Sequence, residues 1–121
     1  VQTCALPIFS LKSLYLSFFQ VENITDDGIL YLREALRKLK VLNDLAIVFT
    51  FCKKITDLGV GLLIETLRCM ETLSTLCIDF SMCGMAKSSM KSFQHMLKSL
   101  KNITNLTMKF SDYGYSGFDS S

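Results

Sequence analysis

The stretch LNDLAIVF, residues 42–49, recurs in three related forms along this chain of 121 residues. The other forms are LKSLYLSF at 11–18, LSTLCIDF at 73–80 and ITNLTMKF at 103–110, so successive starts differ by 31, 31 and 30 residues. Self-similarity at a nearly fixed period of roughly 20–50 residues is typical of repeat architectures. The sequence therefore predicts four copies of one structural unit.

All four copies follow the pattern apolar-x-x-Leu-x-apolar-x-Phe, whose last three apolar positions lie two residues apart. In a β-strand, side chains two residues apart point to the same face. The pattern predicts strands near 13–18, 44–49, 75–80 and 105–110. The side chains expected to point inward are Leu14, Leu16, Phe18, Leu45, Ile47, Phe49, Leu76, Ile78, Phe80, Leu106, Met108 and Phe110.

A helical pattern follows each of the first three strands. Apolar residues recur there at spacings of three, four and three, which places them in one stripe along a helix. The pattern predicts helices near 26–39, 57–70 and 88–100. The stripes are Ile29, Leu32, Leu36 and Leu39, then Val60, Leu63, Leu67 and Met70, then Met90, Phe93, Leu97 and Leu100.

Short polar side chains precede or open each predicted helix, within VENITDDG at 21–28 and CKKITDLG at 52–59 for the first two. Such side chains can accept hydrogen bonds from the free amide groups at a helix start. The expected capping residues are Thr25 and Asp26, then Thr56 and Asp57, and in the third copy Ser88 or Ser89. The recurring phrase is thus interpreted as the turn and cap of each copy.

A strand, a turn and a helix cannot bury both of their apolar faces alone, so the copies are expected to stack. Strands joined by helices on one side form a parallel sheet with the helices outside it. The predicted fold class is α/β, a solenoid over residues 9–110 with parallel strands on its concave face and helices on its convex face.

The four L-x-x-L-x-L-like strands resemble leucine-rich repeats, and the long helices are similar to those of the ribonuclease-inhibitor-like class. CKKITDLG also resembles the C-x-x-I-T-D-x-G turn of the cysteine-containing subtype found in adaptor proteins of ubiquitin ligases. The resemblance covers residues 11–110. Val21 stands at the cysteine position of the first copy, and the third copy, CGMAKSS, lacks the I-T-D-x-G. The spacing is similar as well to the long repeats of helical protist repeat proteins.

The two ends depart from the repeat pattern. Residues 1–8, VQTCALPI, resemble a translated sequencing adapter, and Pro7 would break a helix there, so a non-native or disordered extension is expected. Residues 111–121 are expected to be the truncated start of a further repeat or a tail. Because neither end supplies a polar capping unit, the chain is predicted to be a fragment of a longer array that associates when isolated.

Composition limits the classes of partner. A hydrophobic fraction of 50% suits one unit with a sizeable core, and a net charge of +2 gives no large field of one sign. Neither a nucleic acid nor a membrane is therefore predicted as a partner, and the apolar stretches are too short to cross a bilayer.

The five cysteines form neither the C-x-x-C pairs of a zinc site nor a dense disulfide framework. They are interpreted as reduced thiols of a cytoplasmic or nuclear protein. Three N-x-T tripeptides begin at Asn23, Asn102 and Asn105, but this pattern is so permissive that they are attributed to chance.

No catalytic residue, metal site or cofactor is predicted, and the chain is expected not to be an enzyme. His95, the only histidine, falls on the polar side of the third helix, whereas Cys77 falls on a strand, so the two cannot form a nucleophile–base pair. Gly59 and Gly61 lack the Lys-Ser/Thr that follows a phosphate-binding loop.

The residues that alternate with the inward ones are predicted to bind a protein partner on the concave face. Solenoids use such extended surfaces for protein partners, and tyrosine is often energetically important at interfaces. The candidates are Ser13, Tyr15, Ser17, Asp44, Ala46, Val48, Thr75, Cys77, Asp79, Asn105, Thr107 and Lys109.

The predicted function is a non-enzymatic protein-binding scaffold, and two alternatives remain open. The resemblance of CKKITDLG implies the substrate-recognition segment of a ubiquitin-ligase adaptor. The ribonuclease-inhibitor-like class implies a regulator of a small GTPase, which would require a catalytic arginine on a loop beside the strands. Arg33, Arg37 and Arg68 all fall within predicted helices instead.

Overall fold

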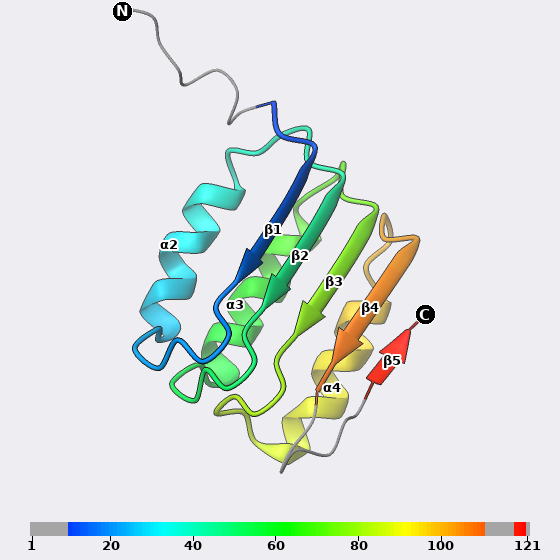
Figure 1. The fold of residues 1–121 in the computed structure, drawn as a ribbon. Coiled ribbons are helices and arrows are strands. Elements are labelled where there is room, and N and C mark those ends of the chain that lie inside the picture. Colours follow the sequence, from blue (N-terminus) through cyan, green and yellow to red (C-terminus); the bar gives the residue numbers. More distant parts are fainter. Residues whose placement is uncertain (1–9, 111–117, 121) are drawn as a thin grey trace, which may run out of the picture.

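The computed structural model describes residues 10–110 and 118–120 (Figure 1). The predictions for residues 1–8, and those for 111–117 and 121, lie outside the described residues. Strands and helices alternate along the described chain in the order β1 (Ser13–Ser17), α2 (Asp26–Leu36), β2 (Asp44–Val48), α3 (Asp57–Arg68), β3 (Thr75–Asp79), α4 (Lys87–Lys98), β4 (Asn105–Lys109) and β5 (Phe118–Ser120).

Strands β1 to β4 lie side by side in sequence order in one five-stranded sheet, and each of these four is parallel to the next. Their register aligns the equivalent leucines Leu14, Leu45, Leu76 and Leu106 across the sheet. The prediction of an α/β fold with four parallel strands and three helices is therefore confirmed. The sequence did not predict β5, which pairs antiparallel with β4.

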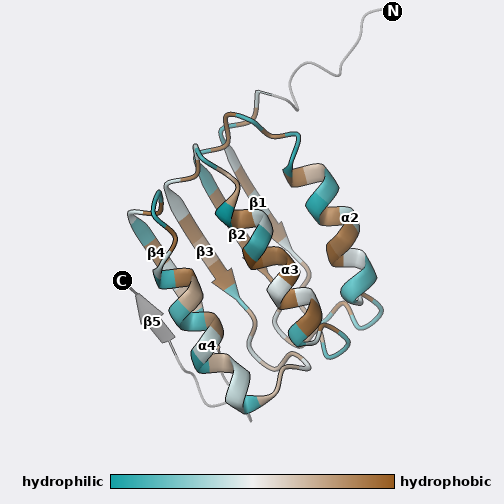
Figure 2. Ribbon diagram, turned by 180° about the vertical axis from the view of Figure 1, so that it is seen from behind, coloured by the Kyte–Doolittle hydropathy of each residue, from teal (hydrophilic) through white to brown (hydrophobic). Residues whose placement is uncertain are grey.

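The helices α2, α3 and α4 form a single layer on one face of the sheet (Figure 1). Within that layer α2 packs beside α3, and α3 packs beside α4. Figure 2 shows the same layer from behind, with apolar and polar residues alternating along each helix as expected for amphipathic helices. No helix in the described part of the chain is both long and apolar enough to span a membrane.

The core lies between the sheet and the helix layer. The inward side chains of β2 and β3, among them Leu45 and Ile78, are almost completely buried. The equivalent Leu14 and Leu16 of β1 are only half-buried, because β1 has a described neighbouring strand on one side only. Burial of such side chains from both directions is the main stabilising contribution of stacked repeats.

A column of phenylalanine rings runs through the core just past the strand ends. Phe18, Phe49 and Phe80 stack with centroid separations of 5.3 Å and interplanar angles of 10° and 4°. Phe80 and Phe110 are 5.6 Å apart and tilted by 39°. Each such ring contact contributes about 0.5–1.5 kcal/mol beyond the burial of area, so the column helps to fix the alignment of neighbouring copies.

The turn after each of the first three strands contains a residue in the left-handed region, namely Gln20, Phe51 and Met82, with φ of 57°, 65° and 61°. In the second copy, the Cys52 N–H closes the turn by donating to the Phe49 carbonyl at 3.0 Å. A positive φ at the third turn position is usually supplied by glycine or asparagine. The sequence therefore contains no local signal for the positive φ at these three residues.

The turn cysteines connect adjacent copies. The Cys52 thiol donates to the Phe18 carbonyl at 2.9 Å, and the Cys83 thiol donates to the Phe49 carbonyl at 3.0 Å. Each thiol thus adds a second hydrogen bond to a carbonyl, just past the strand of the preceding copy, that already accepts a backbone N–H. Burial raises the pKa of both thiols, that of Cys83 to about 12, so both remain protonated donors at neutral pH.

The threonine caps are as predicted, whereas the aspartates act on a different helix. The Thr25 and Thr56 hydroxyls accept from the Asp27 and Leu58 N–H groups of their own helices. The Asp26 carboxylate instead reaches the next copy, where it accepts from Thr56 N–H at 2.9 Å, Thr56 Oγ1 at 2.6 Å and Gly59 N–H at 3.1 Å. It therefore joins the starts of α2 and α3.

The predicted serine cap of the third helix is wrong. The residue at the N-cap of α4 is Ala86, because the third turn is one residue shorter between its cysteine and its cap than the second. The Asp57 carboxylate accepts from Ala86 N–H at 3.1 Å and from the Ser89 hydroxyl at 2.7 Å. Ser89 thus supplies the hydroxyl that Thr56 supplies in the preceding copy.

Candidate functional site

The structure places the twelve candidate binding residues on the sheet face that carries no helices, which we call the open face (Figure 1). None of the twelve is buried, and the strand register aligns them in three rows across β1–β4. The rows are Ser13, Asp44, Thr75 and Asn105, then Tyr15, Ala46, Cys77 and Thr107, then Ser17, Val48, Asp79 and Lys109.

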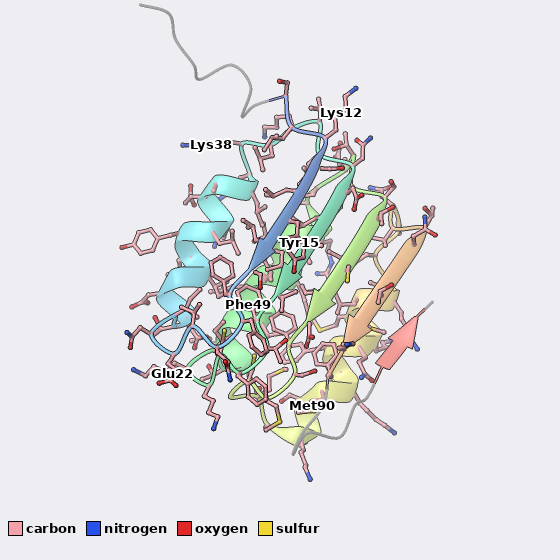
Figure 3. The ribbon with its side chains drawn as sticks, viewed as in Figure 1. Lys12, Tyr15, Glu22, Lys38, Phe49 and Met90 are labelled. Carbon is pink, nitrogen blue, oxygen red and sulfur yellow. The ribbon has the colours of Figure 1, made fainter. Side chains whose placement is uncertain are left out.

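The open face has a weakly polar centre and polar margins. Tyr15, at the start of the middle row, is 67% exposed, and it lies on the foremost strand in Figure 3. Asp79 accepts a hydrogen bond from the Ser81 N–H at 2.8 Å, which fixes its carboxylate at the end of β3. A surface of this kind offers one large aromatic side chain among hydrogen-bonding groups, which suits contact with another protein.

The exposed thiol of Cys77 lies in the middle of the open face. Partial burial raises its pKa, and the carboxylates of Asp79 and Asp44 raise it further, while Lys109 opposes them. The thiolate is therefore disfavoured at neutral pH, which makes Cys77 a poor nucleophile. His95 is exposed on α4, in the helix layer, so the sheet separates it from Cys77.

The three arginines all lie in the helix layer. Arg33 is within α2, Arg37 is its C-cap, and Arg68 is the last residue of α3. Arg37 pairs with Glu34 at 3.5 Å, and Arg68 pairs with Glu65 at 3.0 Å, both on exposed helix surfaces. No arginine therefore lies on the turns beside the strands.

A groove that the sequence did not predict lies at the carboxyl ends of β1 and β2. It has a volume of about 320 Å³ and is lined by Gln20, Glu22, Phe51, Lys53 and Lys54. Figure 3 shows Glu22 among the turns at this end of the molecule. The groove depends on two turns in which Gln20 and Phe51, rather than glycines, adopt a positive φ. The repeat pattern contains no signal for such turns, so it did not predict the groove.

Two further hollows of about 400 and 380 Å³ lie between the carboxyl ends of successive helices. Both contain equivalent positions of neighbouring copies, such as Leu36 in one and Leu67 in the other. They therefore follow from the stacking of the repeats, and nothing in them points to a ligand.

The architecture defines a class by itself: an α/β repeat with one helix-covered and one uncovered face of a parallel sheet. Comparison of the chain with models of known protein families, with curated proteins and with solved structures gives no match.

Proposed function

We propose that this chain is a leucine-rich-repeat scaffold of the ribonuclease-inhibitor-like class, and that its open face contacts a protein partner without catalysing a reaction. The observation that carries the proposal is the open face itself. Twelve side chains in three aligned rows stand on a sheet whose other face is the packed core, and none of them is buried. Side chains held by a rigid sheet lose little entropy on binding, which favours affinity.

Support for the repeat class comes from interactions that recur once per copy. Four features recur at intervals of 30 or 31 residues: the phenylalanine of the column, the left-handed turn residue, the thiol-to-carbonyl hydrogen bond and the bridging aspartate. Each of them joins one copy to the next, as a solenoid requires. In the proposed solenoid, the open face is the concave side.

Support for a protein partner comes from the chemistry of the open face. Its charged members are two aspartates and one lysine, which do not form the basic stripe that a nucleic acid requires. The free thiols of Cys52, Cys69, Cys77 and Cys83 favour a reducing compartment, so we place the interaction in the cytoplasm or the nucleus.

One observation favours the ubiquitin-ligase adaptor alternative over the GTPase regulator. The residues that resemble the cysteine-containing subtype, Cys52, Thr56 and Asp57, all form hydrogen bonds between neighbouring copies. The turn residues thus link neighbouring copies, which is the role expected of residues that define a repeat. A GTPase regulator would need an arginine beside the strands, and the arginines lie in the helix layer.

Selection from a phage-displayed library of random peptides tests the proposal, because such peptides concentrate on the surface best able to bind. We expect the selected peptides to lose at least tenfold in affinity for Tyr15→Ala and for Thr107→Arg. The variant His95→Ala, on exposed α4, is the matched control and should bind normally. Peptides that bind Tyr15→Ala and Thr107→Arg as tightly as the unaltered chain would overturn the proposal.

A further inference from the structure

An aromatic pair lies at the groove at the carboxyl ends of β1 and β2: Phe51 is in its lining, and Phe19 is in contact with Phe51 beside it. Phe19 of the first copy packs edge-on against Phe51 of the second, with ring centroids 5.8 Å apart and an interplanar angle of 82°. Phe19 remains 52% exposed in spite of this contact. The Phe51 N–H donates to the Ser81 carbonyl at 2.9 Å, so the backbone of the neighbouring copy holds Phe51 in place.

One wall of the groove is basic. Lys53 and Lys54 both line it and are both exposed. The ion pairs within the described residues are Arg37–Glu34 and Arg68–Glu65, so neither lysine is neutralised by a paired carboxylate there. Among the described residues that line the groove, Glu22 is the only acidic one, so they carry an excess of positive charge.

The repeat fold does not itself require these side chains. In the third copy Met82 takes the left-handed position of Phe51, and that turn has Gly84 in the region where the second copy has the two lysines. The third copy nevertheless forms the same strand, turn and helix. Exposed aromatic and basic residues that the fold can do without suggest a role in recognition.

The groove also continues the open face. Ser17 and Val48 belong to the open-face row nearest the carboxyl ends of the strands. Phe19 lies two residues after Ser17, and Phe51 lies three residues after Val48. A partner that covers this end of the open face therefore lies close enough to reach the groove as well.

We propose that the groove binds an acidic segment of the protein partner, with an aromatic or aliphatic side chain of that segment packed on Phe19 and Phe51. This inference rests on the proposed scaffold function and names the chemistry of its partner. Carboxylates of the segment pair with Lys53 and Lys54, while its apolar side chain covers the exposed ring of Phe19. A single-stranded nucleic acid would also stack on aromatic rings, but it needs a longer basic track than two lysines beside Glu22.

Fluorescence anisotropy with defined probes tests the proposal. The first probe is a labelled 12-residue peptide of Glu and Asp with one Phe and one Leu at its centre. Its counterparts replace the acids with Lys, replace Phe and Leu with Ala, or are a twelve-nucleotide oligothymidylate. We expect saturable binding of the first probe, at least tenfold weaker binding of each counterpart, and a further loss at high salt.

Variants locate the binding. Lys53→Glu combined with Lys54→Glu, and separately Phe19→Ala, should each weaken the first probe at least tenfold. The control is Lys38→Glu combined with Lys91→Glu, which reverses two exposed lysines of the helix layer and should change little. Absence of saturable binding, equal binding to the groove variants, or preference for the oligonucleotide would each overturn the proposal.

The two proposals can fail separately. If library-selected peptides depend on Tyr15 but neither they nor the acidic probe respond to Lys53→Glu with Lys54→Glu, the groove inference is wrong and the scaffold function stands. If the selected peptides ignore Tyr15 and Thr107, the open-face proposal is wrong, whatever the acidic probe does.

Discussion

At the scale of single residues, the two glycines of α3 differ sharply in their surroundings. A Cβ on Gly59 would overlap the Asp26 carboxylate, whereas a Cβ on Gly61 would meet no atom within 4 Å. Gly59 is therefore required by the close approach of a side chain from the preceding copy, and Gly61 is not.

Gly59→Ala should displace Asp26 and lower the free energy of unfolding by about 1–3 kcal/mol, since the bonded amides at the α3 start lose their acceptor. Gly61→Ala should raise it by roughly 0.5–1 kcal/mol, because alanine is the better helix residue. Urea denaturation of the two variants measures both changes. Equal effects of the two substitutions would show that the Asp26 bridge has no energetic role.

The raised pKa of Cys83 predicts a dependence of stability on pH. Burial is the main cause of the shift from 9.0 to about 12, with smaller contributions from Cys52 and Asp79. The folded chain keeps this proton where the unfolded chain releases it, so the stabilising effect is complete below pH 9 and is lost between pH 9 and 12. In Cys83→Ser the hydroxyl can still donate to Phe49 but does not titrate in this range.

Urea denaturation of both proteins from pH 8 to pH 11.5 provides the measurement. The free energy of unfolding of the unaltered chain should fall relative to that of Cys83→Ser as the pH rises. Groups that do not interact with residue 83 are common to both proteins, so the difference reports on residue 83 and its neighbours. A difference that stays constant over this range would contradict the assignment.

At the scale of elements, the aspartate bridges couple each helix start to the next. Asp57 accepts from the Ala86 N–H and the Ser89 hydroxyl, so the start of α4 is held by a residue 29 to 32 positions away. Carboxylates that accept such bonds favour a helix N-terminus through both hydrogen bonding and the helix dipole. Stacking and helix capping are therefore the same interaction in this fold.

A double-mutant cycle on Asp57→Ala and Ser89→Ala measures this coupling. Asp57→Ala should lower the free energy of unfolding by about 1–3 kcal/mol. The two changes should be non-additive by at least about 0.5 kcal/mol, because each removes the same bond. Asp27→Ala serves as a control, since the Asp27 side chain is exposed in the first turn of α2. Strict additivity would mean that the bridge does not persist in solution.

The positions of the elements follow from local periodicity, and the contacts between copies do not. The observed strands begin at the predicted residues and end one residue earlier, and the helices end two or three residues earlier. The last turn of α2 tightens, as in the bond from the Leu39 N–H to the Leu36 carbonyl at 3.0 Å, so Leu39 is buried without being helical. The Asp26 bridge spans 30 positions, and no local pattern contains it.

At the scale of the whole molecule, the sheet divides the chain into a core side and an open face. Leu45→Asp places a charge at a fully buried position and should unfold the chain, whereas Tyr15→Ala should change the free energy of unfolding by less than about 0.5–1 kcal/mol. Circular dichroism with thermal melting distinguishes the two results. Collapse of Tyr15→Ala would show that the strand faces are assigned the wrong way round.

The candidate site was only partly accessible from the sequence. The alternation of inward and outward residues sufficed to place Tyr15 and Cys77 in one row, because strand periodicity is strict. The groove with Phe51, Lys53 and Lys54 depends instead on non-glycine residues in left-handed turns and on the stacking of two copies. Those features are set by the tertiary structure.

Two native cysteines allow the open face to be probed by thiol labelling. Cys77 lies exposed in the middle of that face, and Cys69 lies exposed at the C-cap of α3 in the helix layer. Maleimide labelling of each thiol, followed by peptide mass spectrometry, is compared with and without a saturating library-selected peptide. If the open face is the binding surface, labelling of Cys77 slows at least tenfold and labelling of Cys69 is unchanged. Protection of Cys69 with Cys77 still freely labelled would contradict it.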